Sequence, residues 1–172
     1  DLLSLSRLEQ FKQKELKFEY YTIAKIITGA VYVCRKNVEK QGIDIQLDLD
    51  EGVKGYVNPL LLEQAIVNLI DNAIKYSDNG GSIQISLTTD DVTYNVITVK
   101  DSGCGIPSKH LSRIFERFYR VDKARSRELG GTGLGLAIVK HIASVHQGEV
   151  TVKSVLNEGS TFTIKLPIHT HE

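Results

Sequence analysis

The stretch 59–76 has the period of a long helix that is buried along one side. Pro59 suits the first turn of a helix, because proline fixes φ and its missing N–H has no helical partner there. Apolar side chains then recur every three or four residues, at Leu62, Ala65, Ile66, Leu69, Ile70, Ala73 and Ile74. Such a stripe must be covered by other elements, so this helix is expected to lie in the core of the fold.

The other periodic stretches predict further helices and strands around this one. Helical patterns occupy 1–17, 23–40, 107–114 and the region from the glycines at 130–135 to His146. Strand patterns occupy 43–49, 82–89, 94–101, 149–155 and 160–167. This order predicts an α/β fold, a two-layer sandwich in which a mixed, mostly antiparallel sheet carries helices on one face.

The charges of the chain are balanced, with 21 Lys and Arg residues against 21 Asp and Glu residues. A nucleic-acid-binding protein would carry a basic footprint, so no nucleic-acid partner is predicted. The sequence has no apolar run of membrane-spanning length and no signal-peptide pattern at its start. Cys34 and Cys104 lack the spacing of a metal site, and the prediction is a reduced cytosolic domain with two structural thiols.

A polar row accompanies the apolar stripe of 59–76. Gln64, Asn68, Asn72 and Lys75 are spaced by four, four and three residues, which places them on one side of the helix. Asparagine forms helices less well than the Glu and Lys of an ordinary solvated face. Its amide oxygen is a hard ligand for Mg²⁺, and its NH₂ group can donate to a phosphate. The alternative at this point is that these amides only bond to neighbouring backbone.

Asp101 stands where a strand would bury an apolar residue. Alternation along 94–101 puts Ile97, Val99 and Asp101 on one face, and the sequence continues as SGCGIP. An inward carboxylate needs hydrogen-bond donors, because burying an unpaired charge costs on the order of several kcal/mol. The donors are either the amides of Gly103 and Gly105 or the amino group of a ligand such as adenine.

Residues 130–136 read GGTGLGL and run straight into an apolar helical pattern. A helix N-terminus carries free N–H groups and a partial positive charge, which together attract phosphate. Gly131, Thr132, Gly133 and Gly135 would let these amides approach an anion closely. The run lacks the G-K-[ST] ending of a P-loop, and no strand precedes it as a dinucleotide-binding fingerprint requires.

The stretch 115–133 has no clean period and is long for a connection. It holds three acids and five cations, the cations being Arg117, Arg120, Lys123, Arg125 and Arg127. It is either a solvated surface loop or a basic lid that closes over a triphosphate, with the glycines as its hinge.

In this order, NLIDNAIKYS, DSGCGIP, FERFYR and GGTGLGLAIVKHI resemble the N, G1, F and G2 boxes of bacterial sensor histidine kinases of the PhoR-like and WalK-like type. The resemblance covers most of 59–147. It implies the Bergerat ATP-binding fold of the gyrase, heat-shock chaperone, histidine kinase and MutL superfamily. It also implies that 1–17 is the end of the second dimerisation helix and that 18–172 is the catalytic ATP-binding domain.

The resemblance further implies roles for single residues, with ATP and Mg²⁺ as cofactors. Asn72 is similar to the magnesium ligand of the family, and Asp101 to the residue that holds the adenine amino group. Asn68, near the phosphates, and Arg120, at the terminal phosphate, would be the catalytic residues. The other implied ATP contacts are Lys75, Tyr76, Gly103, Gly105, Ile106, Tyr119, Gly131, Thr132, Gly133, Leu134, Gly135 and Thr161.

One departure within the superfamily favours a kinase. In the gyrase-like hydrolases the position of Asn68 holds a glutamate that activates water, and an amide cannot accept that proton. Glu63 is one residue off the polar row and is expected to point elsewhere. The alternatives are an ATP hydrolase or conformational clamp, a scaffold that only binds a response regulator, and a serine-protein kinase of the anti-sigma type.

The phosphate acceptor of this family is a histidine in an H-E-x-[RK]-[TN]-P-type sequence, and no histidine here has that context. The five histidines, which are His110, His141, His146, His169 and His171, are predicted to be surface residues. The chain is therefore expected to lack the acceptor. The implied partners are the dimerisation and phosphotransfer domain of the same kinase and a response regulator. The implied whole protein is a membrane-anchored homodimer with this chain in its cytoplasmic portion.

Overall fold

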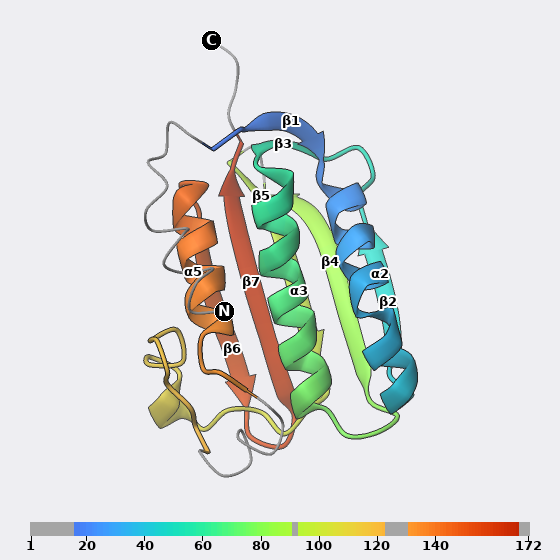
Figure 1. Cartoon of the computed structure of the whole chain (residues 1–172), viewed down its shortest axis with the longest axis vertical. Coiled ribbons are helices and arrows are strands. Elements are labelled where there is room, and N and C mark those ends of the chain that lie inside the picture. The colour runs from blue at the N-terminus through green and yellow to red at the C-terminus, as the bar shows by residue number, and fades with distance from the viewer. Residues whose placement is uncertain (1–15, 91–92, 123–130, 169–172) are drawn as a thin grey trace.

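A five-stranded sheet carries α-helices on one of its faces (Figure 1). This computed structural model describes residues 16–90, 93–122 and 131–168. The strands follow the order β2–β4–β5–β7–β6, and only the β2–β4 pair is parallel. They are β2 (Asp44–Leu49), β4 (Ser82–Asp90), β5 (Tyr94–Asp101), β6 (Glu149–Val155) and β7 (Gly159–Pro167).

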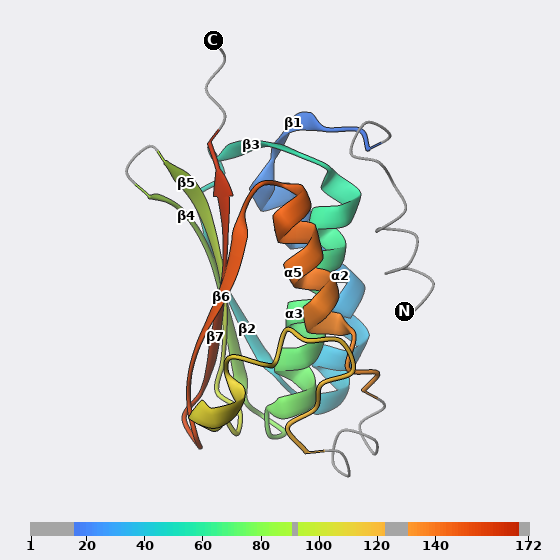
Figure 2. The same cartoon turned by 90° about the vertical axis from the view of Figure 1, so that its left-hand side faces the viewer.

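The helices are α2 (Ile23–Gln41), α3 (Pro59–Tyr76) and α5 (Gly135–Val145), and Figure 2 shows them on the same side of the sheet. The predicted two-layer α/β sandwich is therefore confirmed. None of the helices in the described ranges is long and apolar enough to cross a membrane.

Some predicted elements differ from the structure. Two short strands, β1 (Glu19–Thr22) and β3 (Lys54–Val57), were not predicted, and they pair antiparallel in a small separate sheet. Each has four residues, which is too short to show a period. The predicted helix over 107–114 is wrong, because only the 3₁₀ turn η2 (Ser108–His110) forms there. The predicted helix 1–17 lies outside the described residues, apart from its last two positions.

Helix α3 lies between α2 and α5 (Figure 1) and carries much of the core. The side chain of Asn58 caps it, because Oδ1 accepts a hydrogen bond from the backbone N–H of Leu61 at 3.0 Å. All seven residues of its apolar stripe are buried. Full burial of one such aliphatic side chain is worth about 1.5–3 kcal/mol, so the stripe fixes which side of α3 faces the core.

His146 contradicts the prediction that the histidines lie on the surface. It follows α5 directly, and the residue is 4% exposed. Its Nδ1 donates to the carbonyl oxygen of Ile142 at 2.8 Å, and its Nε2 accepts from the backbone N–H of Asn58 at 3.0 Å. The ring of Phe18 packs edge-on, with 5.1 Å between ring centroids. A neutral imidazole therefore joins the end of α5 to the start of α3. His169 and His171 lie outside the described residues.

Burial of His146 predicts that the fold loses stability in mild acid. Burial lowers the pKa of its imidazole below the usual 6.5, although its two backbone hydrogen bonds oppose this shift. Below pH 6.5 the unfolded chain then binds more protons than the folded chain at this position. The free energy of unfolding should therefore fall as the pH drops through 6.5, by at most about 1.4 kcal/mol per pH unit for one proton.

Urea unfolding between pH 7.5 and 5.5 measures this dependence, with His146→Gln as the comparison. The glutamine cannot titrate, so the variant should show a shallower slope even if its absolute stability is lower. Equal slopes for both proteins would show that His146 does not cause the acid sensitivity.

Candidate functional site

A cavity of about 480 Å³ lies between α3, the start of α5 and the segments 104–107 and 119–122. The end of β5 and the start of β7 also reach its wall. The predicted site residues that line it are Asn68, Asn72, Lys75, Tyr76, Asp101, Gly105, Ile106, Tyr119, Arg120, Gly131, Thr132, Gly133 and Gly135. The fold thus brings together residues from four separate parts of the sequence.

The polar row of α3 forms one side of the cavity. Asn68 donates from Nδ2 to the carbonyl oxygen of Gly135 at 3.3 Å, which ties α3 to the start of α5. The side chains of Gln64, Asn72 and Lys75 have no hydrogen-bond or ion-pair partner among the described residues. The alternative that these amides only bond to backbone therefore explains one hydrogen bond of Asn68 and none of the other three polar groups. Those three groups are available to a ligand.

Asp101 lies on the buried face of β5, as the alternation predicted, and is 6% exposed. Its Oδ1 accepts hydrogen bonds from the backbone N–H groups of Gly103 at 2.9 Å and Ser160 at 3.3 Å. No donor within the described part of the chain bonds to Oδ2. Burial raises the pKa of this carboxyl above its usual value, and the two N–H donors limit that rise. Oδ2 of this largely buried residue is thus an acceptor without a described donor at the cavity wall.

The glycines after Asp101 are required by the protein's own packing. A Cβ at Gly103 would lie 2.4 Å from the carbonyl oxygen of Tyr76. A Cβ at Gly105, whose φ is +69°, would lie 2.1 Å from the carbonyl oxygen of Val155. Gly105 lines the cavity and Gly103 does not. Backbone thus fills the space beside each glycine, and the position of Gly103 does not support its predicted contact with ATP.

The glycine-rich segment ends at α5, which has no side-chain cap at its N-terminus. Gly133 has a φ of +73°, and its carbonyl oxygen accepts from the backbone N–H of Phe118 at 2.8 Å. A Cβ at Gly135 would meet nothing within 4 Å, and this residue lines the cavity. Leu134 is 2% exposed and belongs to the core, so the prediction that it contacts the ligand is not supported by its position.

The predicted lid is described only in part, since 123–130 lies outside the described residues. Within the described part, Arg120 donates from Nη2 to the carbonyl oxygen of Gly131. The hydroxyl of Tyr119 lies 2.5 Å from Nδ1 of His110, and the guanidinium of Arg113 lies over its ring. The first contact joins Arg120 to the glycine-rich segment, and the other two hold Tyr119 against residues 110–113.

The prediction for Thr161 is wrong by one position in the register of β7. Along β7, Ser160 and Phe162 are buried, whereas Thr161 lies between them on the other face of the sheet, opposite Lys100 and Lys153. Ser160 is the residue that contacts Asp101 and lines the cavity.

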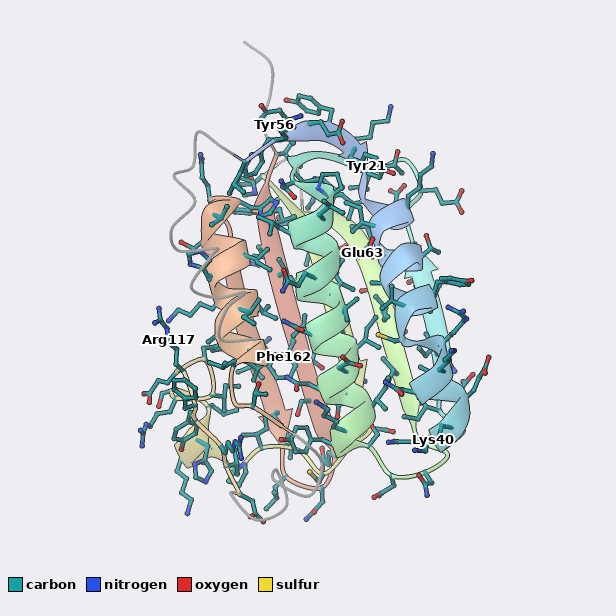
Figure 3. The ribbon with its side chains drawn as sticks, viewed as in Figure 1. Tyr21, Lys40, Tyr56, Glu63, Arg117 and Phe162 are labelled. Atoms are coloured by element: carbon teal, nitrogen blue, oxygen red, sulfur yellow. The ribbon has the colours of Figure 1, made fainter. Side chains whose placement is uncertain are left out.

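Figure 3 shows Phe162 between α5 and α3, where its ring packs against that of Phe115.

Sequence reasoning also missed several residues of the cavity wall. Gln64 was placed in the polar row but received no role, and Asp71, Asn157 and Ser160 were not considered. Strand alternation could have identified Ser160, whereas only tertiary structure places Asn157, whose backbone N–H donates to the carbonyl oxygen of Cys104 at 2.7 Å.

The two cysteines occupy different environments. Cys34 is buried, and desolvation, followed in importance by the nearby charge of Asp71, raises the pKa of its thiol to about 12. This fits the prediction of a structural thiol. Cys104 is partly exposed and lies at the cavity wall.

The side chains of the cavity wall suit a metal ion that takes few oxygens from the protein and the rest from a bound ligand and water. Among the described residues, no group of three or more His, Cys, Asp or Glu side chains could hold a metal ion. Mg²⁺ in nucleotide sites typically takes one or two protein oxygens, with phosphate and water oxygens for the rest. The unpaired amide of Asn72 at the cavity wall can supply one such oxygen.

Comparison with known proteins agrees with this geometry. Residues 57–170 match the family described as histidine kinase-, DNA gyrase B- and HSP90-like ATPases. The sensor histidine kinase RppB of Synechocystis sp. is 43% identical over 169 residues, which cover 98% of this chain and 37% of RppB. The sensor histidine kinase WalK of Bacillus subtilis is 38% identical over 170 residues, which cover 97% of this chain and 27% of WalK. The chain thus spans well under half the length of these relatives.

Solved structures show the same fold. The mycobacterial sensor histidine kinase MprB superposes with a TM-score of 0.77 at 27% identity, covering 88% of this chain and 97% of that one. Full-length ShkA, solved in complex with AMPPNP, superposes with a TM-score of 0.83 at 25% identity, covering 99% of this chain and 35% of that one.

Proposed function

Because the chain belongs to the family of histidine kinase-, DNA gyrase B- and HSP90-like ATPases, we propose that its cavity binds Mg–ATP for transfer of the terminal phosphate to a histidine. The chain would then act as the ATP-binding catalytic domain of a two-component sensor histidine kinase. One observation carries the proposal. Oδ2 of Asp101 and the polar groups of Gln64, Asn72 and Lys75, which have no partner among the described residues, line the same cavity.

Asp101 would define the adenine end of the site. Its Oδ2 can accept from the exocyclic amino group of adenine, which would satisfy an acceptor that lacks a donor in the described chain. Tyr76, which is 36% exposed at the cavity wall, would pack beside the base together with Ile106. Gly105 also lines this cavity, and its positive φ and the nearby carbonyl of Val155 already require glycine there.

The phosphates would lie farther along α3, toward the start of α5. Lys75 and Arg120 would contribute positive charge, and the backbone of the segment Gly131–Gly135, with the hydroxyl of Thr132, would donate hydrogen bonds. Asn72 would hold Mg²⁺ through its amide oxygen, and the ion would neutralise charge on the triphosphate. Tyr119 would close over the nucleotide as part of the lid.

Asn68 and Arg120 would be the residues nearest the reaction. Asn68 cannot take a proton from water, and its amide is already bonded to the carbonyl oxygen of Gly135. Helix α3 carries two carboxylates: Glu63 faces α2, with Oε2 3.1 Å from where a Cβ of Gly29 would stand, and Asp71 accepts from the thiol of Cys34 at 3.9 Å. The site would therefore position ATP and stabilise its charge without activating water, which favours transfer to an incoming nucleophile over hydrolysis.

The whole protein would supply the other components. We propose that 1–17 continues a dimerisation helix, that 18–172 is the catalytic domain, and that the acceptor histidine lies on a dimerisation domain. A response regulator would receive the phosphoryl group. Homodimerisation and membrane anchoring of the whole protein are proposed on the same basis, since the relatives RppB and WalK are sensor histidine kinases.

Radiolabelled ATP, marked at its terminal phosphate, tests the reaction. We expect no covalent label on this chain alone, because none of its histidines has the acceptor context. Addition of the dimerisation domain should give a label on that domain that is stable in alkali and lost in acid, as phosphohistidine is. The variant Asn72→Ala serves as the control and should reduce this label strongly. Steady release of inorganic phosphate without any labelled protein would instead identify a hydrolase.

A further inference from the structure

Gln64 is the one member of the polar row of α3 to which the proposed function gives no task. It precedes Asn68 by four residues, about one helical turn, and lines the same cavity. Its carboxamide has no hydrogen-bond partner among the described residues. A half-buried amide with free donors and a free acceptor is suited to a polar ligand group.

The neighbouring carboxylate shows that this orientation is specific. Glu63 points to α2, where its Oε2 lies beside Gly29, and Figure 3 shows it on the side of α3 toward that helix. The charge of Glu63 is thus directed toward α2, while the neutral amide of Gln64 lines the cavity. A neutral donor can approach a phosphate without the repulsion that a carboxylate would cause.

The direction of the nucleotide follows from the proposed function, on which this inference rests. The adenine end lies at Asp101, next to the C-terminal end of α3, where the backbone N–H of Cys104 donates to the carbonyl oxygen of Tyr76 at 3.1 Å. From Tyr76 to Gln64, α3 rises about 18 Å. Sugar and successive phosphates would therefore lie progressively nearer to Gln64, with the terminal phosphate nearest of all.

The hydrogen bond of Asn68 leaves Gln64 with more free donors at that end. Asn68 uses one N–H of Nδ2 on the carbonyl oxygen of Gly135, whereas both N–H groups of Gln64 are unused within the described residues. We propose that Gln64 donates to the terminal phosphate of ATP and thereby makes the cavity prefer ATP over ADP.

Calorimetric titration of Mg–ATP and Mg–ADP into the wild type and Gln64→Ala tests this proposal. We expect ATP affinity to fall about tenfold, which corresponds to roughly 1.4 kcal/mol, while ADP affinity changes less than twofold. Gln64→Glu keeps the shape but replaces the donor with a charge, so it should lose ATP affinity by at least as much. Gln84→Ala, which removes an exposed glutamine of β4, is the matched control and should alter neither affinity.

The ratio of the two affinities separates a phosphate contact from a structural effect. Equal losses for ATP and ADP in Gln64→Ala, or no loss for either, would overturn the proposal. If the wild type binds neither nucleotide, the proposed function itself fails, and this result is distinct because no variant is needed to see it.

Discussion

Replacing Asp101 by asparagine is expected to weaken Mg–ATP binding at least tenfold, or by about 1.4 kcal/mol. The substitution keeps the size of the side chain and an oxygen for the backbone N–H groups of Gly103 and Ser160. It replaces Oδ2 by an NH₂ group, which would face the amino group of adenine with a second donor. Replacing an acceptor by a donor in such a site weakens binding strongly, because the donor groups of protein and ligand are then left unpaired where water is excluded.

The same variant should fold at least as well as the wild type. Burial raises the pKa of Asp101, so at neutral pH its charge is less favourable in the folded chain than in the unfolded one. The protonated carboxyl favours the folded chain. Its stabilising contribution is therefore complete at pH below the unfolded pKa and is lost as the pH rises through the higher folded pKa. Asparagine has no charge to bury, so the free energy of unfolding at pH 7 should be equal or higher. Unchanged ATP affinity in a folded Asp101→Asn protein would remove Asp101 from the site.

Replacing Gly105 by alanine is expected to reduce the free energy of unfolding by about 3 kcal/mol or more. Its φ of +69° is strained for a residue with a Cβ, and that Cβ would lie 2.1 Å from the carbonyl oxygen of Val155. The clashing atom belongs to the backbone, so the chain must move to relieve it. Urea unfolding measures the loss.

Gly135→Ala is the matched control, because a Cβ there meets nothing within 4 Å and its φ is not positive. Alanine favours helix over glycine by about 1 kcal/mol, so stability should be unchanged or slightly higher at this first residue of α5. The added methyl group should weaken Mg–ATP binding, since Gly135 lines the cavity. A Gly105→Ala protein as stable as Gly135→Ala would contradict the packing described for the turn after β5.

The main elements and the residues of two motifs could be predicted because their signals are local. The period of 59–76 identified the buried stripe and the polar row of α3, and the alternation of 94–101 placed Asp101 on the buried face. Both patterns arise from the geometry of a single helix or strand, which repeats every few residues.

The errors arose where distant segments decide the environment. His146 is buried because Asn58 and Phe18, far away in the sequence, pack against it. Ser160 rather than Thr161 reaches Asp101 because the pairing of β5 with β7 sets Asp101 opposite Ser160. Gly103 is required by the carbonyl of Tyr76 on another element. No pattern within one segment contains such information.

Nuclear magnetic resonance of the isotope-labelled chain, titrated with Mg–ATP, tests the central claim most directly. The account predicts saturable shifts of backbone amides concentrated in the second half of α3, in 101–106 and in 131–136, with little change in β1, β3 or the outer side of α2. Absence of saturable shifts, or shifts concentrated away from the cavity, would show that it is not the nucleotide site.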